Sequence, residues 1–340
     1  MSSGGAGRDL RFVVPAGVDD PARVSGGNVY DREVRDGLGR HGWRVRTAEA
    51  ADASHVASAL DDLPRGGVAL VDGMVAGWAP AAVEAAARRG HPVVLAHLVT
   101  AAFPGATADA VEAERRVLRA AAGVIATSRW TAAELACRGL AERSRIAVAV
   151  PGSRDRPPAI GPVGHRDLLC VGVLAPHKGQ DVLLDALARV GEGWTLTLAG
   201  SRTTDPAFAA RVAAAAGPFG DRVRLAGVLD GGDLDRAHRR AGVLVAPSRT
   251  ESFGMAIADA RRRGMPVIAT EAGGIPEAVA GGGAILVPPG DPVALADALR
   301  RWMTDPALRA RLRVEALRAR ALAPRWADTV ARVDQALAAA

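Results

Sequence analysis

Short apolar runs alternate along the chain with longer segments in which apolar residues recur every three or four positions. The short runs are bounded by glycine, proline or aspartate, which is typical of buried strands, and the longer segments are typical of helices. The first half therefore predicts strands at Leu10–Val14, Trp43–Thr47, Val68–Asp72, Pro92–Ala96, Gly123–Thr127 and Ile146–Val150, and helices at Asn28–Gly39, Ala79–Arg89, Ala106–Ala122 and Thr131–Cys137. This alternation predicts a parallel, doubly wound sheet.

The same alternation begins again after residues 151–164, a segment rich in proline and glycine. Such a segment suits neither a helix nor a central strand, so it is predicted to link two domains. A length of 340 residues, which exceeds one ordinary core, also favours two domains. The second half predicts a helix at Gly179–Val190 and strands at Asp167–Val173, Trp194–Ala199, Arg222–Ala226, Val243–Ala246, Met265–Thr270 and Ala284–Val287.

The last part of the chain is helical and rich in arginine, with an interruption at Pro324. A fresh amphipathic pattern at Trp326–Leu337 predicts a helix that returns to the first domain. We therefore expect an α/β protein with one Rossmann-like domain at residues 1–157, a second at 165–322, and a returning helix at 323–340.

The net charge of +6 equals the surplus of arginine over acidic residues between Arg300 and Arg332. A solvated helix face is the favoured interpretation, and weak attraction to an anionic membrane is the alternative. No basic stripe is interleaved with aromatic residues, so nucleic acid is not expected as a partner. The chain has neither a long uncharged apolar run nor an apolar signal segment, which predicts a cytoplasmic protein. Both cysteines, Cys137 and Cys170, are expected to be reduced packing residues, without a thiolate metal site.

Residues 244–279 hold the densest set of candidate functional groups. A predicted buried strand ends before Glu251, which stands at the mouth of a loop, and Asp259 lies on the helix that follows. The next strand, Met265–Thr270, ends in a loop with Gly273–Gly274 before another helix. Two successive helix starts with free backbone N–H groups would form a cradle for a diphosphate.

Three other positions add to this chemistry. Lys178 is the only lysine among 43 basic residues, and it follows the first strand of the second domain. A lysine ammonium is compact whereas an arginine is a planar fork, so the solitary lysine indicates a position that needs the compact cation. His97 directly follows the fourth strand, at the end of the sheet where ligands bind. The pair Gly26–Gly27 precedes a helix; a tight turn explains it, as does close approach of a ligand. It is not the Gly-x-Gly-x-x-Gly fingerprint, which argues against a nicotinamide enzyme.

Together these motifs resemble the retaining glycosyltransferases of family 4, which have the GT-B architecture of two facing Rossmann-like domains with a cleft between them. The resemblance covers roughly Leu10 to Val333. It is most specific in residues 247–279, PSRTESFGMAIADARRRGMPVIATEAGGIPEAV. Weaker matches are Val171–Leu174 with His177–Gly179, the Gly26–Gly27 pair, His97 and Gly227–Val228.

The resemblance implies a role for each matching residue. Glu251 would bind hydroxyls of the donor sugar, Lys178 would neutralise the diphosphate and His97 would face the sugar, and these three are our candidate catalytic residues. Gly26 and Gly27 would approach the phosphates, and Gly200 and Val228 would hold the nucleobase. Asp259 would meet the ribose, and the amides of Phe253, Gly254 and Met255 would donate to the diphosphate. Gly172 and Val173 are the remaining implied donor-binding positions.

Two positions depart from the family pattern. Val173 stands where the family usually has an arginine, and Asp259 is one methylene shorter than the usual glutamate. Losing one charge-assisted hydrogen bond, about 1.5–3 kcal/mol, would weaken donor binding tenfold or more unless Arg202 or Arg249 took its place.

The leading hypothesis is an enzyme that transfers a hexosyl group from a UDP- or GDP-sugar to a hydroxyl of a small-molecule or glycan acceptor, with retention of configuration. A fixed ammonium and a helix start would stabilise the departing diphosphate, so neither a metal nor another cofactor is expected. The alternatives are a nucleotide-sugar epimerase of the same architecture and a non-catalytic paralogue that binds nucleotide sugars.

Overall fold

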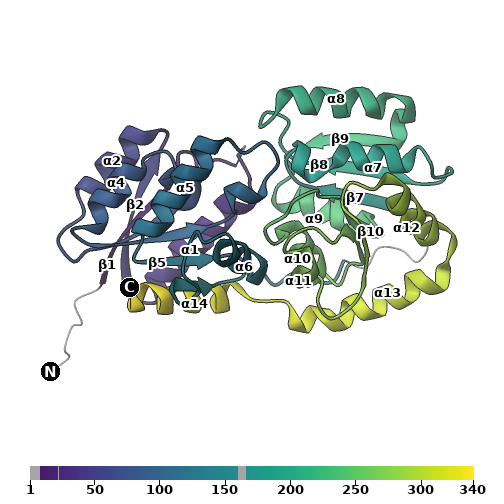
Figure 1. Ribbon diagram of the computed structural model, residues 1–340. Coiled ribbons are helices and arrows are strands. Elements are labelled where there is room, and N and C mark those ends of the chain that lie inside the picture. The colour runs from purple at the N-terminus through teal and green to yellow at the C-terminus, as the bar shows by residue number, and fades with distance from the viewer. Residues whose placement is uncertain (1–7, 22, 160–165) are drawn as a thin grey trace. The chain divides into compact units, whose positions relative to one another are not determined.

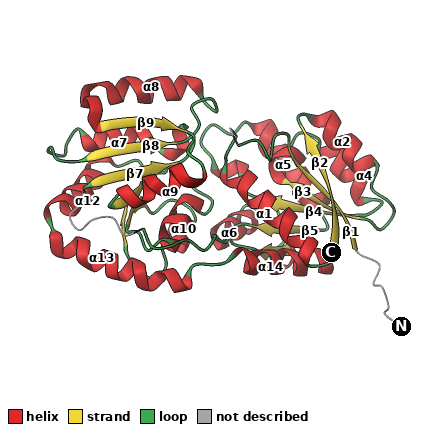
Figure 2. Ribbon diagram, turned by 180° about the vertical axis from the view of Figure 1, so that it is seen from behind, coloured by secondary structure: helices red, strands yellow, loops and turns green. Residues whose placement is uncertain are grey.

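The computed structural model describes residues 8–21, 23–159 and 166–340, which divide into two compact units. Unit 1 comprises residues 8–20, 27–152 and 324–340, and unit 2 comprises the described residues of 21–26 and 153–323. Each unit has a central parallel sheet with helices on both faces (Figures 1 and 2). The predicted doubly wound α/β fold is confirmed for both.

The described part of unit 1 contains a six-stranded parallel sheet in the order β2-β1-β3-β4-β5-β6. All of its predicted strands are confirmed. The strands are β1 (Arg8–Pro15), β2 (Trp43–Ala50), β3 (Val68–Asp72), β4 (His91–Ala96), β5 (Gly123–Ala126) and β6 (Ile146–Val148). The helices are α1 (Gly26–Arg40), α2 (Ala53–Asp61), α3 (Gly73–Ala76), α4 (Pro80–Ala87), α5 (Ala108–Ala120), α6 (Arg129–Cys137) and α14 (Trp326–Ala339), with the 3-10 turns η1 (Thr100–Ala102) and η2 (Arg143–Arg145).

The carboxyl-terminal helix α14 packs on unit 1, as the pattern at Trp326–Leu337 predicts. The indole of Trp326 meets the buried ring of Tyr30 edge to face, with centroids 5.6 Å apart. The hydroxyl of Thr329 donates to the carbonyl oxygen of Val150 at 2.8 Å. Because these contacts bury one face of α14, the helix completes the core of a unit whose strands lie far earlier in the chain.

Unit 2 contains, in its described residues, a second six-stranded parallel sheet in the order β12-β11-β10-β7-β8-β9. The strands are β7 (Asp167–Val171), β8 (Thr195–Ala199), β9 (Val223–Gly227), β10 (Val243–Ala246), β11 (Val267–Thr270) and β12 (Ala284–Val287). The helices are α7 (Gln180–Leu187), α8 (Pro206–Ala216), α9 (Gly231–Arg240), α10 (Met255–Arg262), α11 (Ile275–Ala278), α12 (Pro292–Thr304) and α13 (Pro306–Ala319), with the turns η3 (Pro176–Lys178), η4 (Gly217–Arg222) and η5 (Arg320–Leu322).

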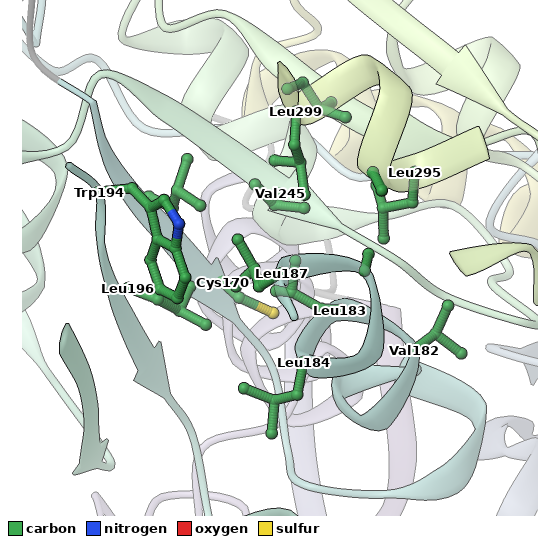
Figure 3. Close-up of a cluster of buried hydrophobic side chains, with 14 of the residues drawn as sticks. Cys170, Val182, Leu183, Leu184, Leu187, Trp194, Leu196, Val245, Leu295 and Leu299 are labelled. Atoms are coloured by element: carbon green, nitrogen blue, oxygen red, sulfur yellow. The ribbon is translucent and has the colours of Figure 1, made fainter. Parts of the chain in front are cut away.

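One core cluster of unit 2 lies between its sheet and the helices α7 and α12, and a second includes residues of α10 and α11. Figure 3 shows Trp194 and Leu187 in the first cluster, together with Cys170. Burial raises the pKa of the Cys170 thiol to about 12, so Cys170 is an inert packing residue, as expected. Cys137 is also a free cysteine, as expected, but it is not a packing residue: it ends α6 and is exposed, because the apolar face of that short helix is provided by residues such as Leu135.

Residues 153–159 of the predicted linker belong to unit 2, whereas Pro151 and Gly152 belong to unit 1. Arg262 pairs with Asp155, and the carbonyl oxygen of Arg263 accepts the amide of Ala159 at 2.9 Å. The remainder, residues 160–165, lies outside the described residues. Some carboxyl-terminal arginines are also structural: Arg320 donates to the carbonyl of Arg156 at 2.8 Å rather than extending into solvent. No helix among the described residues is long and apolar enough to cross a membrane.

Candidate functional site

The two principal candidate residues of unit 2 follow neighbouring strands. Strand β7 continues to β8 on one side, whereas β10, β11 and β12 extend the sheet on the other, so the strand order switches between β7 and β10. Open α/β sheets bind ligands at such a switch, outside the carboxyl ends of the strands. Lys178 lies in the segment after β7 and Glu251 in the segment after β10.

These two side chains are in direct contact. Lys178 Nζ lies 2.5 Å from Glu251 Oε2, and the side chains are 24% and 15% exposed. The hydroxyl of Ser248 lies 3.4 Å from the same carboxylate oxygen. A charge-assisted hydrogen bond between partly buried groups fixes both. The structure thus holds an ammonium and a carboxylate together beyond the carboxyl ends of two central strands, where both remain partly exposed.

The segments that carry Lys178 and Glu251 are bound to each other. The amide of Arg249 donates to the carbonyl oxygen of His177 at 2.7 Å. The guanidinium of Arg249 forms two hydrogen bonds of 2.8 Å with the carboxylate of Asp181. Arg249 is therefore committed to a structural ion pair, which argues against it as a replacement for the arginine that the family has at Val173. The carbonyl of Val173 itself accepts a hydrogen bond from Gln180 at 2.9 Å.

The Gly273–Gly274 loop supports the backbone of the Glu251 segment. A Cβ atom on Gly273 would lie 1.9 Å from the carbonyl oxygen of Glu251, and one on Gly274 would lie 2.1 Å from that of Ser252. The amide of Gly274 donates to the Glu251 carbonyl at 2.9 Å. Only glycine permits this approach, so the second glycine loop positions Glu251.

The helix starts at this edge keep their amide donors unoccupied by side chains. Helix α10 begins at Gly254, which has a φ of 100°, and α7 begins at Gly179; neither has a side-chain cap. An aspartate, serine or threonine caps α2, α3, α5, α6, α8, α12 and α13. The first amides of α10, from Met255 onward, are therefore available to an anion. The side chain of Phe253 is buried beneath them.

Two predicted nucleobase positions adjoin the lysine segment. A Cβ on Gly200 would lie 1.8 Å from the carbonyl oxygen of Gly172, so the backbones after β7 and β8 touch. A Cβ on Gly172 would lie 3.6 Å from Lys178 Cδ. The amide of Gly200 donates to the carbonyl of Gly227, directly before Val228, at 2.8 Å. The structure therefore brings Gly172, Gly200, Val228 and the stem of Lys178 together at the carboxyl ends of the strands.

Asp259 has protein partners on α9 and α10. Its Oδ2 lies 3.2 Å from Arg263 Nε and 3.7 Å from His238 Nε2. Burial lowers the pKa of His238, which opposes formation of a full ion pair with Asp259. Asp259 thus belongs to a polar cluster between the two helices. A donor ribose bound by Asp259 would be a further hydrogen-bonding partner in this cluster.

His97 lies in unit 1 between two buried aspartates. Its Nε2 is 2.9 Å from Asp31 Oδ1 and 3.4 Å from Asp72 Oδ2. The ring of Tyr30 meets the imidazole edge to face, with centroids 5.2 Å apart. A Cβ on Gly27 would lie 3.6 Å from His97 Cδ2. Four side-chain and backbone surfaces therefore fix the orientation of this imidazole.

Burial and charge act in opposite directions on this cluster. Burial lowers the pKa of His97, but Asp31 and Asp72 outweigh it and raise that pKa above its ordinary value. Burial raises the pKa of Asp72 to about 6, although the charge of His97 opposes the rise. Asp31 Oδ2 is buried and has no hydrogen-bond partner in the described part of the chain. His97 and Asp72 therefore hold their protons to higher pH than isolated groups of the same kinds would.

The sequence interpretation missed Asp31 and Asp72. Each carried a signal: Asp31 is a charged residue on the apolar face of α1, between Tyr30 and Val34, and Asp72 ends the strand beside the one that leads to His97. Asp72 also caps α3, accepting the amide of Met74 at 2.7 Å. Its second oxygen is thereby directed toward His97.

Acidic groups that could hold a metal ion are already engaged. The donor atoms of Asp31, Asp72 and His97 lie within 4.8 Å of one another, which is the spacing of a metal site. Asp31 Oδ1 pairs with His97 Nε2 and Asp72 Oδ1 accepts an amide of α3, whereas Asp31 Oδ2 is buried without a hydrogen-bond partner among the described residues. An Asp-x-Asp pair also occurs, at Asp233 and Asp235 on α9, where both carboxylates pair with arginines.

This fold and placement of residues define a GT-B protein with two Rossmann-like units. A sucrose-phosphate synthase from Thermosynechococcus elongatus superposes with a TM-score of 0.82 at 21% identity, over 96% of this chain and 98% of that one. HepE of Anabaena, solved in complex with UDP-glucose, superposes with a TM-score of 0.76 at 17% identity, over 98% and 100% of the two chains.

Residues 165–305 match the model of the family glycosyl transferases group 1, in agreement with the resemblance seen in the motifs. A D-inositol 3-phosphate glycosyltransferase of Streptomyces avermitilis is 35% identical over 223 residues, 58% of this chain and 48% of that protein. The enzyme of the same name from Acidothermus cellulolyticus is 34% identical over 280 residues, 72% and 61% of the two chains. The aligned region thus spans about half to three fifths of these relatives.

Proposed function

We propose that the protein transfers a hexosyl group from a nucleotide-diphosphate sugar to an acceptor hydroxyl. The observation that carries this proposal is the 2.5 Å contact between Lys178 and Glu251 at the switch point of unit 2, beside the uncapped start of α10. The family of residues 165–305 and the names of the relatives support glycosyl transfer. The UDP-glucose held by HepE favours a UDP-sugar, and a GDP-sugar is the second donor class.

The site provides what departure of a nucleoside diphosphate requires. Cleavage of the bond between the anomeric carbon and the phosphate oxygen places negative charge on the diphosphate. The Lys178 ammonium and the amides at the start of α10 would stabilise that charge without reorganisation. Glu251, held by Lys178 and the Gly273–Gly274 loop, would bind sugar hydroxyls near the reacting carbon. A departing phosphate oxygen on the face of attack would take the acceptor proton, which gives retention.

His97 and its aspartates would contribute a hydrogen-bonding group for a sugar or acceptor hydroxyl. The raised pKa of His97 favours the protonated imidazole, which donates hydrogen bonds and does not act as a base. We therefore assign His97 to binding a sugar or acceptor hydroxyl and assign no proton abstraction to it. The proposal needs no metal, because the cations that face the diphosphate belong to the chain.

Nucleotide release with purified protein tests the proposal. Incubation with UDP- and GDP-sugars should release nucleotide slowly by hydrolysis and faster with a suitable acceptor. NMR of the glycoside product then reports the anomeric configuration, and an inverted product would refute retention. Recovery of an isomerised nucleotide sugar would instead establish an epimerase. Binding of nucleotide sugars without release or isomerisation would establish a non-catalytic protein.

A further inference from the structure

Unit 1 contains a cavity of about 240 Å³ between α3, the segment that follows β4, and α5. His97 forms part of its wall, and the side chains of Met74, Trp78, Leu98 and Val117 line much of the rest. Met74 and Trp78 are 50% and 40% exposed. Large apolar side chains that remain exposed beside a cavity are typical of a surface that a ligand covers.

The charges of this cavity are acidic apart from His97. None of the described residues that line it is lysine or arginine, and Glu114 is its carboxylate. Glu114 Oε1 accepts the amide of Thr100 at 2.8 Å, whereas Oε2 is buried and has no hydrogen-bond partner in the described part of the chain. Burial raises the pKa of Glu114. The neighbouring Arg138 is bound to Glu134 and to the carbonyl of Ala101.

This arrangement discriminates between classes of ligand. An oxygen without a hydrogen-bond partner can accept a hydrogen bond from a hydroxyl or an amine, and leaving it buried and unmatched costs about 1–3 kcal/mol. A phosphate dianion has no proton to donate to that oxygen, and it would bring further negative charge beside the Glu114 carboxyl, with His97 as the cationic group of the described lining. At about 30 Å³ for each water molecule, the cavity holds roughly eight waters, which is room for a ring system with a hydroxyl.

We propose that this cavity binds an uncharged, apolar ring of the acceptor, with a hydroxyl of that ring donating to Glu114. The inference rests on the proposed function, which assigns His97 to binding a sugar or acceptor hydroxyl, because a ring in this cavity would lie against His97. The protein is thus a glycosyltransferase for hydrophobic hydroxylated compounds, not for a phosphorylated polyol.

Binding can be tested without any donor, with 2-naphthol and 2-naphthyl phosphate as a matched pair of probes. Ligand-observed NMR titration should give wild-type protein at least tenfold higher affinity for 2-naphthol than for its phosphate. Ala110→Trp adds an indole to the cavity wall and should weaken 2-naphthol binding at least tenfold. Glu112→Trp adds the same side chain to α5 at a residue that does not line the cavity, and should bind as the wild type does.

A second variant and an activity assay keep the result decisive. Trp78→Ala removes a half-exposed side chain, so unit 1 should stay folded while 2-naphthol binding falls at least fivefold. Equal or tighter binding of 2-naphthyl phosphate, no binding of 2-naphthol, or unchanged binding in both cavity variants would overturn the inference.

If 2-naphthol binds but no nucleotide sugar is ever turned over, the proposed function fails and the cavity is no acceptor site. If turnover occurs and the cavity variants leave the acceptor KM unchanged, the inference alone fails.

Discussion

At the scale of single residues, the contact between Lys178 and Glu251 makes the sharpest prediction. Lys178→Ala removes the cation that faces the diphosphate and leaves Glu251 without its partner, so kcat/KM should fall at least 100-fold, about 2.7 kcal/mol. Lys178→Arg keeps the charge but not the compact ammonium, so it should regain less than a tenth of the kcat/KM that Lys178→Ala loses. Nucleotide release measures both.

The control for this experiment is Arg189→Ala, which deletes an exposed cation of unit 2 whose partner is Asp185. It should change kcat/KM less than twofold, since exposed ion pairs contribute little. Near-normal turnover by Lys178→Ala would show that the donor diphosphate binds elsewhere. Full activity of Lys178→Arg would make the solitary lysine an accident of composition.

Asp72 gives a prediction about pH. Its pKa is about 6 in the folded chain against an ordinary value of 3.8, so between these values the folded chain binds more protons than the unfolded chain. The contribution of Asp72 to stability is therefore lost as pH rises through this window. In the variant Asp72→Asn, the amide side chain does not ionise and can still cap α3. The stability of this variant relative to wild type should thus increase between pH 4 and pH 6, by about 1–3 kcal/mol.

Calorimetric melting at several pH values measures this difference. His177 titrates in the same window, because burial lowers its pKa to about 4, and its effect has the opposite sign: stability is lost as pH falls. His177 lies in unit 2 and is unchanged in Asp72→Asn, so it cancels from the difference. A difference that stays flat from pH 4 to pH 6 would contradict the assignment of Asp72 as a buried, proton-retaining group.

At the scale of elements, the Gly273–Gly274 loop is predicted to position Glu251. Gly274 has an ordinary φ of −81°, so Gly274→Ala adds no backbone strain but places a methyl 2.1 Å from the carbonyl oxygen of Ser252. The loop that carries Glu251 must shift, and donor affinity should fall at least tenfold in a calorimetric titration with UDP-sugar. Gly191→Ala, where an added methyl meets nothing within 4 Å, is the matched control and should bind normally.

Elements also show what the sequence could and could not predict. Periodicity located the strands of both sheets, because buried parallel strands are short apolar runs. Motif spacing placed Lys178 and Glu251 after separate strands of one sheet, and their contact follows from the strand order, which periodicity does not reveal. The pairing of Arg249 with Asp181 and the meeting of Asp31, Asp72 and His97 join segments distant in the chain. Such contacts depend on side-chain directions that only the folded chain defines.

At the scale of the whole molecule, the chain completes unit 1 with its last segment after forming all of unit 2. Helix α14 buries Trp326, Val330, Val333 and Leu337, and fully burying such side chains contributes about 1.5–3 kcal/mol each. Ending the chain after Ala323 would expose Tyr30 and the apolar face that α14 covers. We expect the melting transition of unit 1 to move down by at least 10 °C or to disappear.

Unit 2 keeps all its strands and the Lys178–Glu251 pair, so the truncated chain should still bind UDP with near-normal affinity by calorimetry. A truncated chain that melts as the wild type does would show that α14 adds nothing to unit 1, and loss of UDP binding would show that unit 2 depends on it.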